Sequence, residues 1–124
     1  MTLLEAARDL QAKAAGPTIY DAVDTYYADD VTIVEATGET FHGKETQKDR
    51  IREWQAGVAE IHGGEVKAIA AHETAPGTGV AFVETAMDVT FKEAGRVDFD
   101  EVAVQQWKDG KVVHERFYYN APGA

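Results

Sequence analysis

The sequence predicts a single α+β domain, in which helices from the first half of the chain pack on a sheet formed mainly by the second half. The chain has 124 residues and a hydrophobic fraction of 44%, which suits one globular core. Apolar residues recur at helical spacing in three segments up to residue 61 and at a spacing of two afterwards. Helices first and a curved sheet last is an α+β arrangement, with the helices on one sheet face. We therefore predict one domain over residues 1–124.

Two helices are predicted before the first strand. The first covers residues 2–15, where Thr2 is the N-cap and Glu5 follows three positions later as in a capping box. Gly16-Pro17 ends it, and "TIYDAVDTYY" (residues 18–27) forms a short second helix with an aromatic stripe. The chain then enters a strand over residues 31–36, and "TGETFHG" is a hairpin-like connection.

A third helix and four strands complete the prediction. The helix covers residues 44–61, with Ile51, Trp54, Val58 and Ile61 on one face, and ends at Gly63-Gly64. Strands are expected at residues 65–73, 79–92, 96–108 and 111–120, separated by "APGTG", "KEAG" and "KDGK". Long strands joined by tight turns predict an antiparallel meander, and the final "APGA" is expected to fray.

Composition excludes several classes of function. The chain contains neither cysteine nor serine, so the Ser–His–Asp and Cys–His nucleophiles of many hydrolases are absent. Its net charge of −10 argues against nucleic acid or an anionic membrane as a partner. It has no apolar run of membrane-spanning length and no secretory signal, which predicts a cytoplasmic protein. Without a complete HExxH, phosphate-loop or GxGxxG motif, we predict no metal and no cofactor.

Glu35 is the most informative polar residue. Val31 and Ile33 form an apolar strand face, and Glu35 is the next residue on that face. Either the strand has reached water at this point, or the fold holds an acid inside a pocket. In a pocket, desolvation would raise the pKa of this carboxyl and make it a better base near neutral pH.

Three segments together carry a resemblance to a known family. These are "YYADDVTIVEATG", "FHGKE" at the start of a helix, and "VQQWKDGKVVHERFYYN" near the end. The chain resembles the NTF2-like superfamily, and within it SnoaL-like polyketide cyclases and steroid Δ-isomerase relatives. The resemblance implies an NTF2-like cone, in which a curved antiparallel β-sheet wraps around N-terminal helices and leaves an apolar pocket at its open end. It also implies a homodimer through the outer sheet face, with the outward Tyr118 in the contact.

The resemblance carries over to individual residues only in part. It makes Glu35 the counterpart of the carboxylate base of steroid isomerases. The two oxyanion donors of those enzymes fall near Asp9 and at Ala103, so neither is kept. SnoaL-like cyclases use a His/Asp pair on the late strands, where this chain has His114 and Asn120. The sequence leaves open whether Asp88, Glu84 or Glu101 replaces a missing catalytic acid.

The last two strands supply partners for Glu35. If Ala103 faces inward as the resemblance implies, the alternate residues of segment 97–107 do so too, as do Glu115, Phe117 and Tyr119. We predict Glu35, Tyr119 and Glu101 as catalytic residues. The predicted ligand contacts are Tyr20, Trp54, Phe99, Gln105, Trp107, Glu115 and Phe117.

Three hypotheses of function follow. The first is an acid–base enzyme of isomerase, cyclase or dehydratase type, in which Glu35 moves a proton of a compact, apolar, oxygenated small molecule. The second is a binding domain with the same pocket and no turnover, favoured by the loss of both oxyanion donors. The third is an assembly module whose cone is filled by Trp54, Phe99 and Phe117. The first two require a cavity, and a hydrogen-bond donor near a substrate oxygen opposite Glu35 would distinguish the enzyme from the binding domain.

Overall fold

The computed structural model describes residues 1–120, so the predicted fraying of residues 121–124 lies outside the described residues. Three helices are present: α1 (Leu3–Ala14), α2 (Ile19–Tyr26) and α3 (Lys44–Gly57). The six strands are β1 (Tyr27–Val34), β2 (Thr40–His42), β3 (Val58–Ala75), β4 (Thr78–Phe91), β5 (Gly95–Lys108) and β6 (Lys111–Tyr118). None of the helices within residues 1–120 combines the length and apolar character needed to cross a membrane.

The strands form one sheet in the order β2-β1-β6-β5-β4-β3. Strands β3 to β6 are consecutive antiparallel neighbours, which confirms the predicted meander. The segment predicted as a hairpin-like connection contains β2, which pairs antiparallel with β1. One pairing corrects the expectation of a purely antiparallel sheet: β1 runs parallel to β6, with Ile33 beside Glu115. This parallel contact brings the first strand of the chain next to the last.

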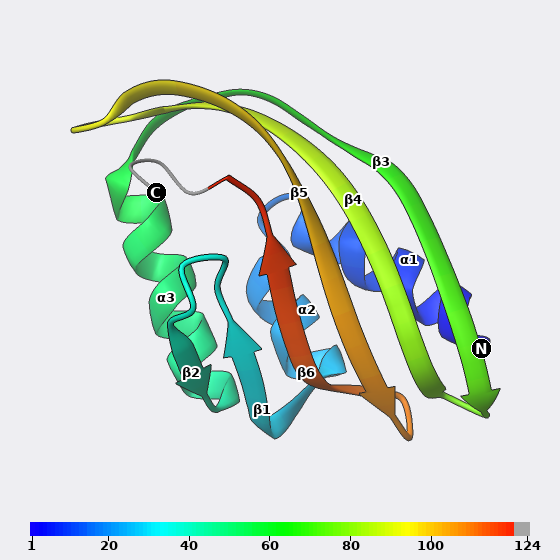
Figure 1. Ribbon diagram of the computed structural model, residues 1–124. Coiled ribbons are helices and arrows are strands. Elements are labelled where there is room, and N and C mark those ends of the chain that lie inside the picture. Colours follow the sequence, from blue (N-terminus) through cyan, green and yellow to red (C-terminus); the bar gives the residue numbers. More distant parts are fainter. Residues whose placement is uncertain (121–124) are drawn as a thin grey trace.

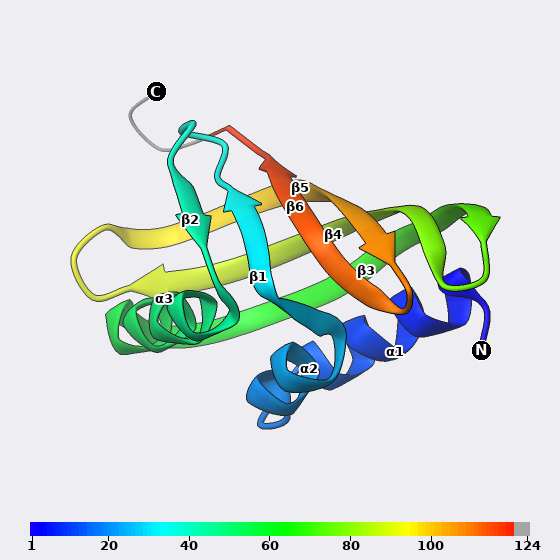
Figure 2. The same ribbon diagram turned by 90° about the horizontal axis from the view of Figure 1, so that it is seen from below.

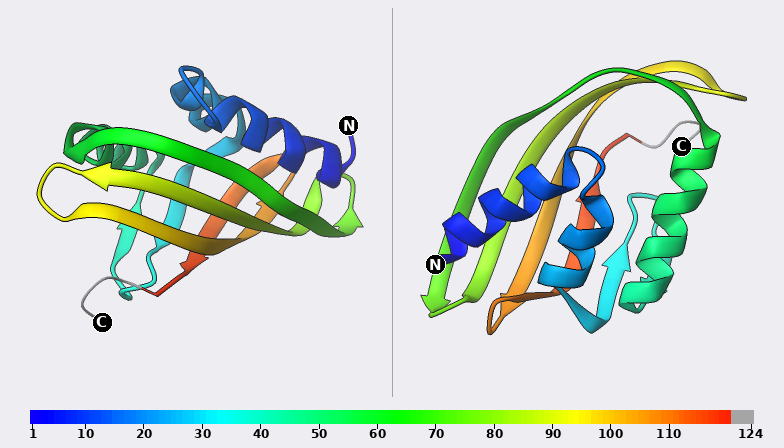
Figure 3. Two further views of the ribbon diagram at one scale, coloured as in Figure 1. Left: turned by 90° about the horizontal axis from the view of Figure 1, so that it is seen from above. Right: turned by 180° about the vertical axis from the view of Figure 1, so that it is seen from behind.

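The sheet is strongly curved and remains open at its edges. Figures 1 and 3 show it curling over the helices, with α1 and α2 inside the curve at one end. The far ends of β3, β4 and β5 arch over α3 at the other end (Figure 1). Seen from below, α1 and α2 lie along one end of the sheet and α3 lies beside β1 and β2 (Figure 2).

The third helix is shorter than predicted. It ends at Gly57, and Val58 and Ile61, expected on its apolar face, instead belong to β3. Gly63 and Gly64, expected to end the helix, lie inside that strand beside register shifts. A glycine weakens a helix by about 1 kcal/mol, and the β-branched residues beyond it favour a strand when a partner is available. Strand β4 supplies that partner by pairing Phe91 with Val58 and Val89 with Ile61.

The main core lies between the concave sheet face and the first two helices. Helix α1 starts with the predicted capping box, in which Thr2 and Glu5 exchange hydrogen bonds of 2.8 and 3.1 Å. Its apolar face and that of α2 pack on the sheet, where Tyr26 and Trp107 make an edge-to-face contact with ring centroids 5.7 Å apart. Helix α3 has no buried residue and packs less deeply. A space therefore remains between α3 and the sheet.

Candidate functional site

A cavity of about 520 Å³ lies between α3 and the arched end of the sheet. This volume is in the range of small-molecule sites. We call this cavity the pocket. Its apolar lining consists of Ile19, Phe41, Ile51, Trp54, Met87, Phe91, Val97, Phe99 and Phe117, and its polar lining of Glu35, Thr37, Glu39, Gln47, Arg50, Glu101, Tyr119 and Asn120. An open pocket argues against the assembly hypothesis, which required a filled cone.

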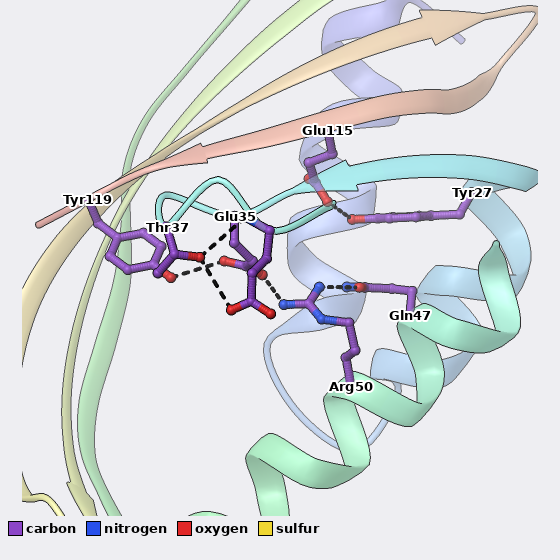
Figure 4. A network of polar contacts seen from close by, with 8 residues as sticks. Tyr27, Glu35, Thr37, Gln47, Arg50, Glu115 and Tyr119 are labelled. Carbon is purple, nitrogen blue, oxygen red and sulfur yellow. Dashed lines mark hydrogen bonds and ion pairs between the residues drawn. The ribbon is translucent and has the colours of Figure 1, made fainter. Parts of the chain in front are cut away.

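Glu35 lies in the turn between β1 and β2, one residue beyond the end of β1 at Val34, and not within the strand predicted over residues 31–36. Its amide donates to the Glu39 carbonyl and its carbonyl accepts from Gly38, both at 2.9 Å. Its carboxylate points into the pocket, where it forms an ion pair with Arg50 and accepts a hydrogen bond from the Tyr119 hydroxyl at 3.0 Å (Figure 4). Glu35 is therefore neither a solvated strand end nor an isolated acid, because it has a cationic partner.

Arg50 is held by two contacts besides its ion pair with Glu35. It projects from α3 toward the β1–β2 turn, and its Nη1 donates to Gln47 Oε1 at 3.0 Å (Figure 4). Its guanidinium lies over the Phe41 ring, 4.0 Å from the ring centroid, in a cation–π contact. The planar group is thus held by Phe41 on one face and by Gln47 and Glu35 at its edge. Arg50 and Tyr119 are two donors that converge on one carboxylate.

Glu101 is the second carboxylate of the pocket, on β5. Burial raises the pKa of Glu101 to about 7, and the nearby charges of Glu115 and Glu35 add to the shift. Each of these effects disfavours the ionised form. Burial, with the neighbouring Glu35 carboxylate, also raises the pKa of the Tyr119 hydroxyl to about 12, so this group remains a donor. The pocket combines an acid that titrates near neutrality with two groups that donate hydrogen bonds.

A buried polar network lies beside the pocket. The Glu115 carboxylate is 2% exposed and accepts from the Tyr27 hydroxyl at 2.5 Å and from Gln105 Nε2 at 2.7 Å. The Trp107 indole in turn donates to Gln105 Oε1 at 3.2 Å. Burial raises the pKa of Glu115, although the two hydrogen bonds that it accepts oppose the shift. The network satisfies a carboxyl group that would otherwise be costly to bury.

The structure brings six of the ten predicted site residues to the pocket. These are Glu35, Glu101, Tyr119, Trp54, Phe99 and Phe117. Gln105, Trp107 and Glu115 face inward as predicted but lie in the buried network, outside the pocket lining. Tyr20 is also outside the lining, and its hydroxyl donates to Gln55 Oε1 at 2.7 Å. Its neighbour Ile19 lines the pocket instead. These four residues, predicted as ligand contacts, therefore lie outside the pocket lining.

Sequence reasoning missed Arg50 and Tyr27. Arg50 is one of several charged residues on a mostly polar helix, and its residue type does not distinguish it from exposed neighbours such as Arg52. A weak signal existed, since Gln47, Arg50, Ile51 and Trp54 recur at helical spacing and all line the pocket. Tyr27 was assigned to the aromatic stripe of the second helix, whereas it begins β1.

The described residues offer little for a bound metal. Among residues 1–120, no group of three or more His, Asp or Glu side chains is arranged to hold an ion. A shallower hollow of about 330 Å³ lies at the bulged part of β3, lined by Gly63, Gly64 and residues of β4 and β5. It has no aromatic wall, so the pocket at α3 is the better candidate for a small-molecule site.

Comparison with known proteins agrees with this geometry. The sequence model of the SnoaL-like domain matches residues 1–119. A proposed SnoaL-like polyketide cyclase from Mesorhizobium loti is 33% identical, with a TM-score of 0.82 over 96% of this chain and 100% of that chain. A search of curated proteins found no match.

More distant structures share the fold. An NTF2-like protein of unknown function from Burkholderia xenovorans LB400 is 28% identical, with a TM-score of 0.68 over 98% of this chain and 88% of that chain. An LEH-like epoxide hydrolase of Mycobacterium tuberculosis is 19% identical, with a TM-score of 0.71 over 95% of this chain and 82% of that chain. The cone predicted from the sequence is therefore the NTF2-like fold.

Proposed function

Because the chain belongs to the SnoaL-like family, we propose that it is a small-molecule acid–base enzyme acting on a compact, apolar, oxygenated substrate in the pocket. The observation that carries this proposal is the pairing of Glu101, whose pKa is about 7, with hydrogen-bond donors in one largely apolar cavity. A base that titrates near the working pH transfers protons most effectively. The names of the relatives, cyclase and epoxide hydrolase, are consistent with this class of chemistry.

In this proposal Glu101 moves the proton. Its carboxylate removes a proton from the carbon next to a carbonyl, and the electron pair moves to the carbonyl oxygen. The Arg50 guanidinium, held by Glu35, donates a further N–H to that oxygen as it becomes negative, and the Tyr119 hydroxyl turns from Glu35 to donate to it as well. Return of the proton to another carbon gives isomerisation, and attack of the carbanion on a second carbonyl of the substrate gives cyclisation. Sequence reasoning had assigned the proton to Glu35, whereas its ion pair with Arg50 favours a positioning role.

One observation favours the alternative, a binding domain without turnover. The single proton of the Tyr119 hydroxyl is already donated to Glu35, so a substrate oxygen must replace that bond before Tyr119 can polarise it. A ligand that only fills the apolar side of the pocket would leave the donors where they are.

The test uses ligand stabilisation followed by proton exchange. Cyclic ketones, phenols and polyketide-like aromatics are screened by thermal shift, where a ligand at 100 times its Kd stabilises the fold by about 2.7 kcal/mol. The best ketones are then followed by NMR in D2O. Wild type should exchange the protons next to the carbonyl, and Glu101→Gln should slow this exchange by about 10²–10⁴-fold. Asp98→Asn, an exposed acid on the same strand, is the control. Binding without exchange would favour the binding domain, and absence of binding would contradict both.

We also propose that a second copy of the chain covers the outer sheet face. Phe82 on β4 and Tyr118 on β6 are 44% and 51% exposed, and both point away from the core. Val104 lies between Phe82 and Arg116 in the sheet register, which extends the apolar surface. Light scattering should show a dimer for wild type and a monomer for Phe82→Glu. A monomeric wild type would contradict this part of the proposal.

A further inference from the structure

The charge of the pocket lining is unbalanced. Its charged residues are Glu35, Glu39, Glu101 and Arg50. Arg50 is already paired with Glu35, which leaves the exposed Glu39 and the mostly buried Glu101 with no cation among the lining residues. The buried Glu115 adds a further acid close enough to affect Glu101. A ligand that entered with a negative charge would meet this excess, so the lining selects against anions.

The walls of the pocket suit a cation. Six of the twelve aromatic residues of the chain line it: Phe41, Trp54, Phe91, Phe99, Phe117 and Tyr119. They come from the sheet and from α3, and Trp54 and Phe91 meet edge to face with centroids 6.3 Å apart. Aromatic faces attract ammonium and guanidinium groups, most strongly where water is excluded. The structure contains an example inside the pocket, since the Arg50 guanidinium lies over the Phe41 ring.

We propose that the ligand of this pocket carries a positive charge, as a protonated amine or a quaternary ammonium group on a compact apolar body. The ammonium group would pair with one oxygen of the Glu101 carboxylate and leave the other oxygen to accept the proton, and the apolar body would lie between Trp54 and the β4–β5 wall. The inference rests on the proposed function only in taking this pocket as the site. The inference extends the proposed function by specifying that the substrate contains a basic nitrogen as well as the reacting oxygen.

The charged and titratable groups around Glu101 determine whether the protein releases or takes up protons when a ligand binds. Glu115 lies on β6 and Tyr119 follows it, Glu35 follows β1, Arg50 comes from α3, and Tyr27 begins β1. A bound cation favours the ionised Glu101 and should release protons near neutral pH. A neutral ketone or alcohol that accepts a hydrogen bond from protonated Glu101 should instead cause proton uptake. The direction of the proton flux is therefore a second readout, independent of affinity.

The experiment compares three ligands of nearly equal size by calorimetry at pH 7.5 and about 0.15 M salt, where long-range attraction is screened. Benzylamine, benzyl alcohol and benzoate are cationic, neutral and anionic. We expect benzylamine to bind about tenfold or more tightly than benzyl alcohol, and benzoate most weakly. Repeating the titration in buffers of different ionisation enthalpy should show proton release for benzylamine only.

Matched variants separate specific pairing from the general attraction of an acidic protein for cations. Glu101→Gln and Glu84→Gln each remove one negative charge, but Glu84 lies on the outer face of the sheet, in register with Tyr118 through Val102. Only Glu101→Gln should abolish the preference for benzylamine.

Two outcomes would overturn the inference. If benzyl alcohol binds as tightly as benzylamine, or if only the ketones of the first screen bind, the ligand is not cationic and the proposed function stands. If neither the three ligands nor the ketones bind, both the inference and the proposed function fall.

Discussion

The Tyr119 hydroxyl donates a hydrogen bond to Glu35 Oε2 across 3.0 Å, although 84 residues separate the two in sequence. The parallel pairing of β1 with β6 makes this contact possible, because it runs the two strands side by side toward the same end of the sheet. Glu35 follows β1 and Tyr119 follows β6, so both reach the pocket from adjacent strand ends.

Tyr119→Phe tests the donor directly. The variant keeps the ring beside Phe99 and loses only the hydroxyl bonded to Glu35. We expect turnover of a substrate found in the ligand screen to fall by about 10²-fold, as for loss of one oxyanion donor. Stability should change by only about 1 kcal/mol, since Arg50 still pairs with Glu35. An unchanged rate would remove Tyr119 from the proposed mechanism.

The Glu35–Arg50 ion pair should show energetic coupling. Glu35→Gln and Arg50→Gln each leave the partner charge partly buried without compensation, whereas the double variant leaves none. Urea unfolding of the three variants and wild type should give a coupling energy of about 0.5–3 kcal/mol. Arg52→Gln with Asp49→Asn, an exposed pair on the same helix, is the reference cycle and should couple far more weakly. Equal coupling in the two cycles would contradict a structural role for Arg50.

Glu101 should make wild-type stability depend on pH. The ordinary pKa of a glutamate is 4.5, and burial raises that of Glu101 to about 7 in the folded protein. Between these values the folded state binds the proton more tightly than the unfolded state, so stability falls as the pH rises through this window. The loss is at most about 3 kcal/mol. The advantage of Glu101→Gln over wild type in Tm should therefore grow from pH 4.5 to pH 8. A constant difference would show that Glu101 ionises normally.

The buried network should be costly to interrupt. Tyr27→Phe removes the hydroxyl that donates to Glu115 and leaves a nearly inaccessible carboxyl with one donor fewer. We expect a destabilisation of about 1–3 kcal/mol in urea unfolding. Tyr20→Phe, which removes an exposed hydrogen bond to Gln55, should cost much less. If the two substitutions cost the same, the Tyr27–Glu115 bond contributes no more than a surface contact.

Local sequence signals predicted most of the secondary structure. The Thr2 capping box, the turn residues and the period-2 alternation depend on neighbours within a few positions, so they can be read without the fold. The alternation shows only which residues share a face, and the family resemblance was needed to assign Glu101, Phe99 and Phe117 to the concave face. The end of α3 was predicted wrongly because pairing of β3 with β4 overrode the helical spacing of Val58 and Ile61.

Only the tertiary structure decided which acid has which environment. The sequence by itself determined the fold class. Together with the family resemblance, it predicted that Glu35, Glu101 and Tyr119 face one pocket. It did not indicate that Arg50 pairs with Glu35 or that Tyr27 bonds to Glu115, because these contacts join elements far apart in the chain. Desolvation and charge depend on every group within a few ångströms, and that set exists only after the sheet has curled over α3.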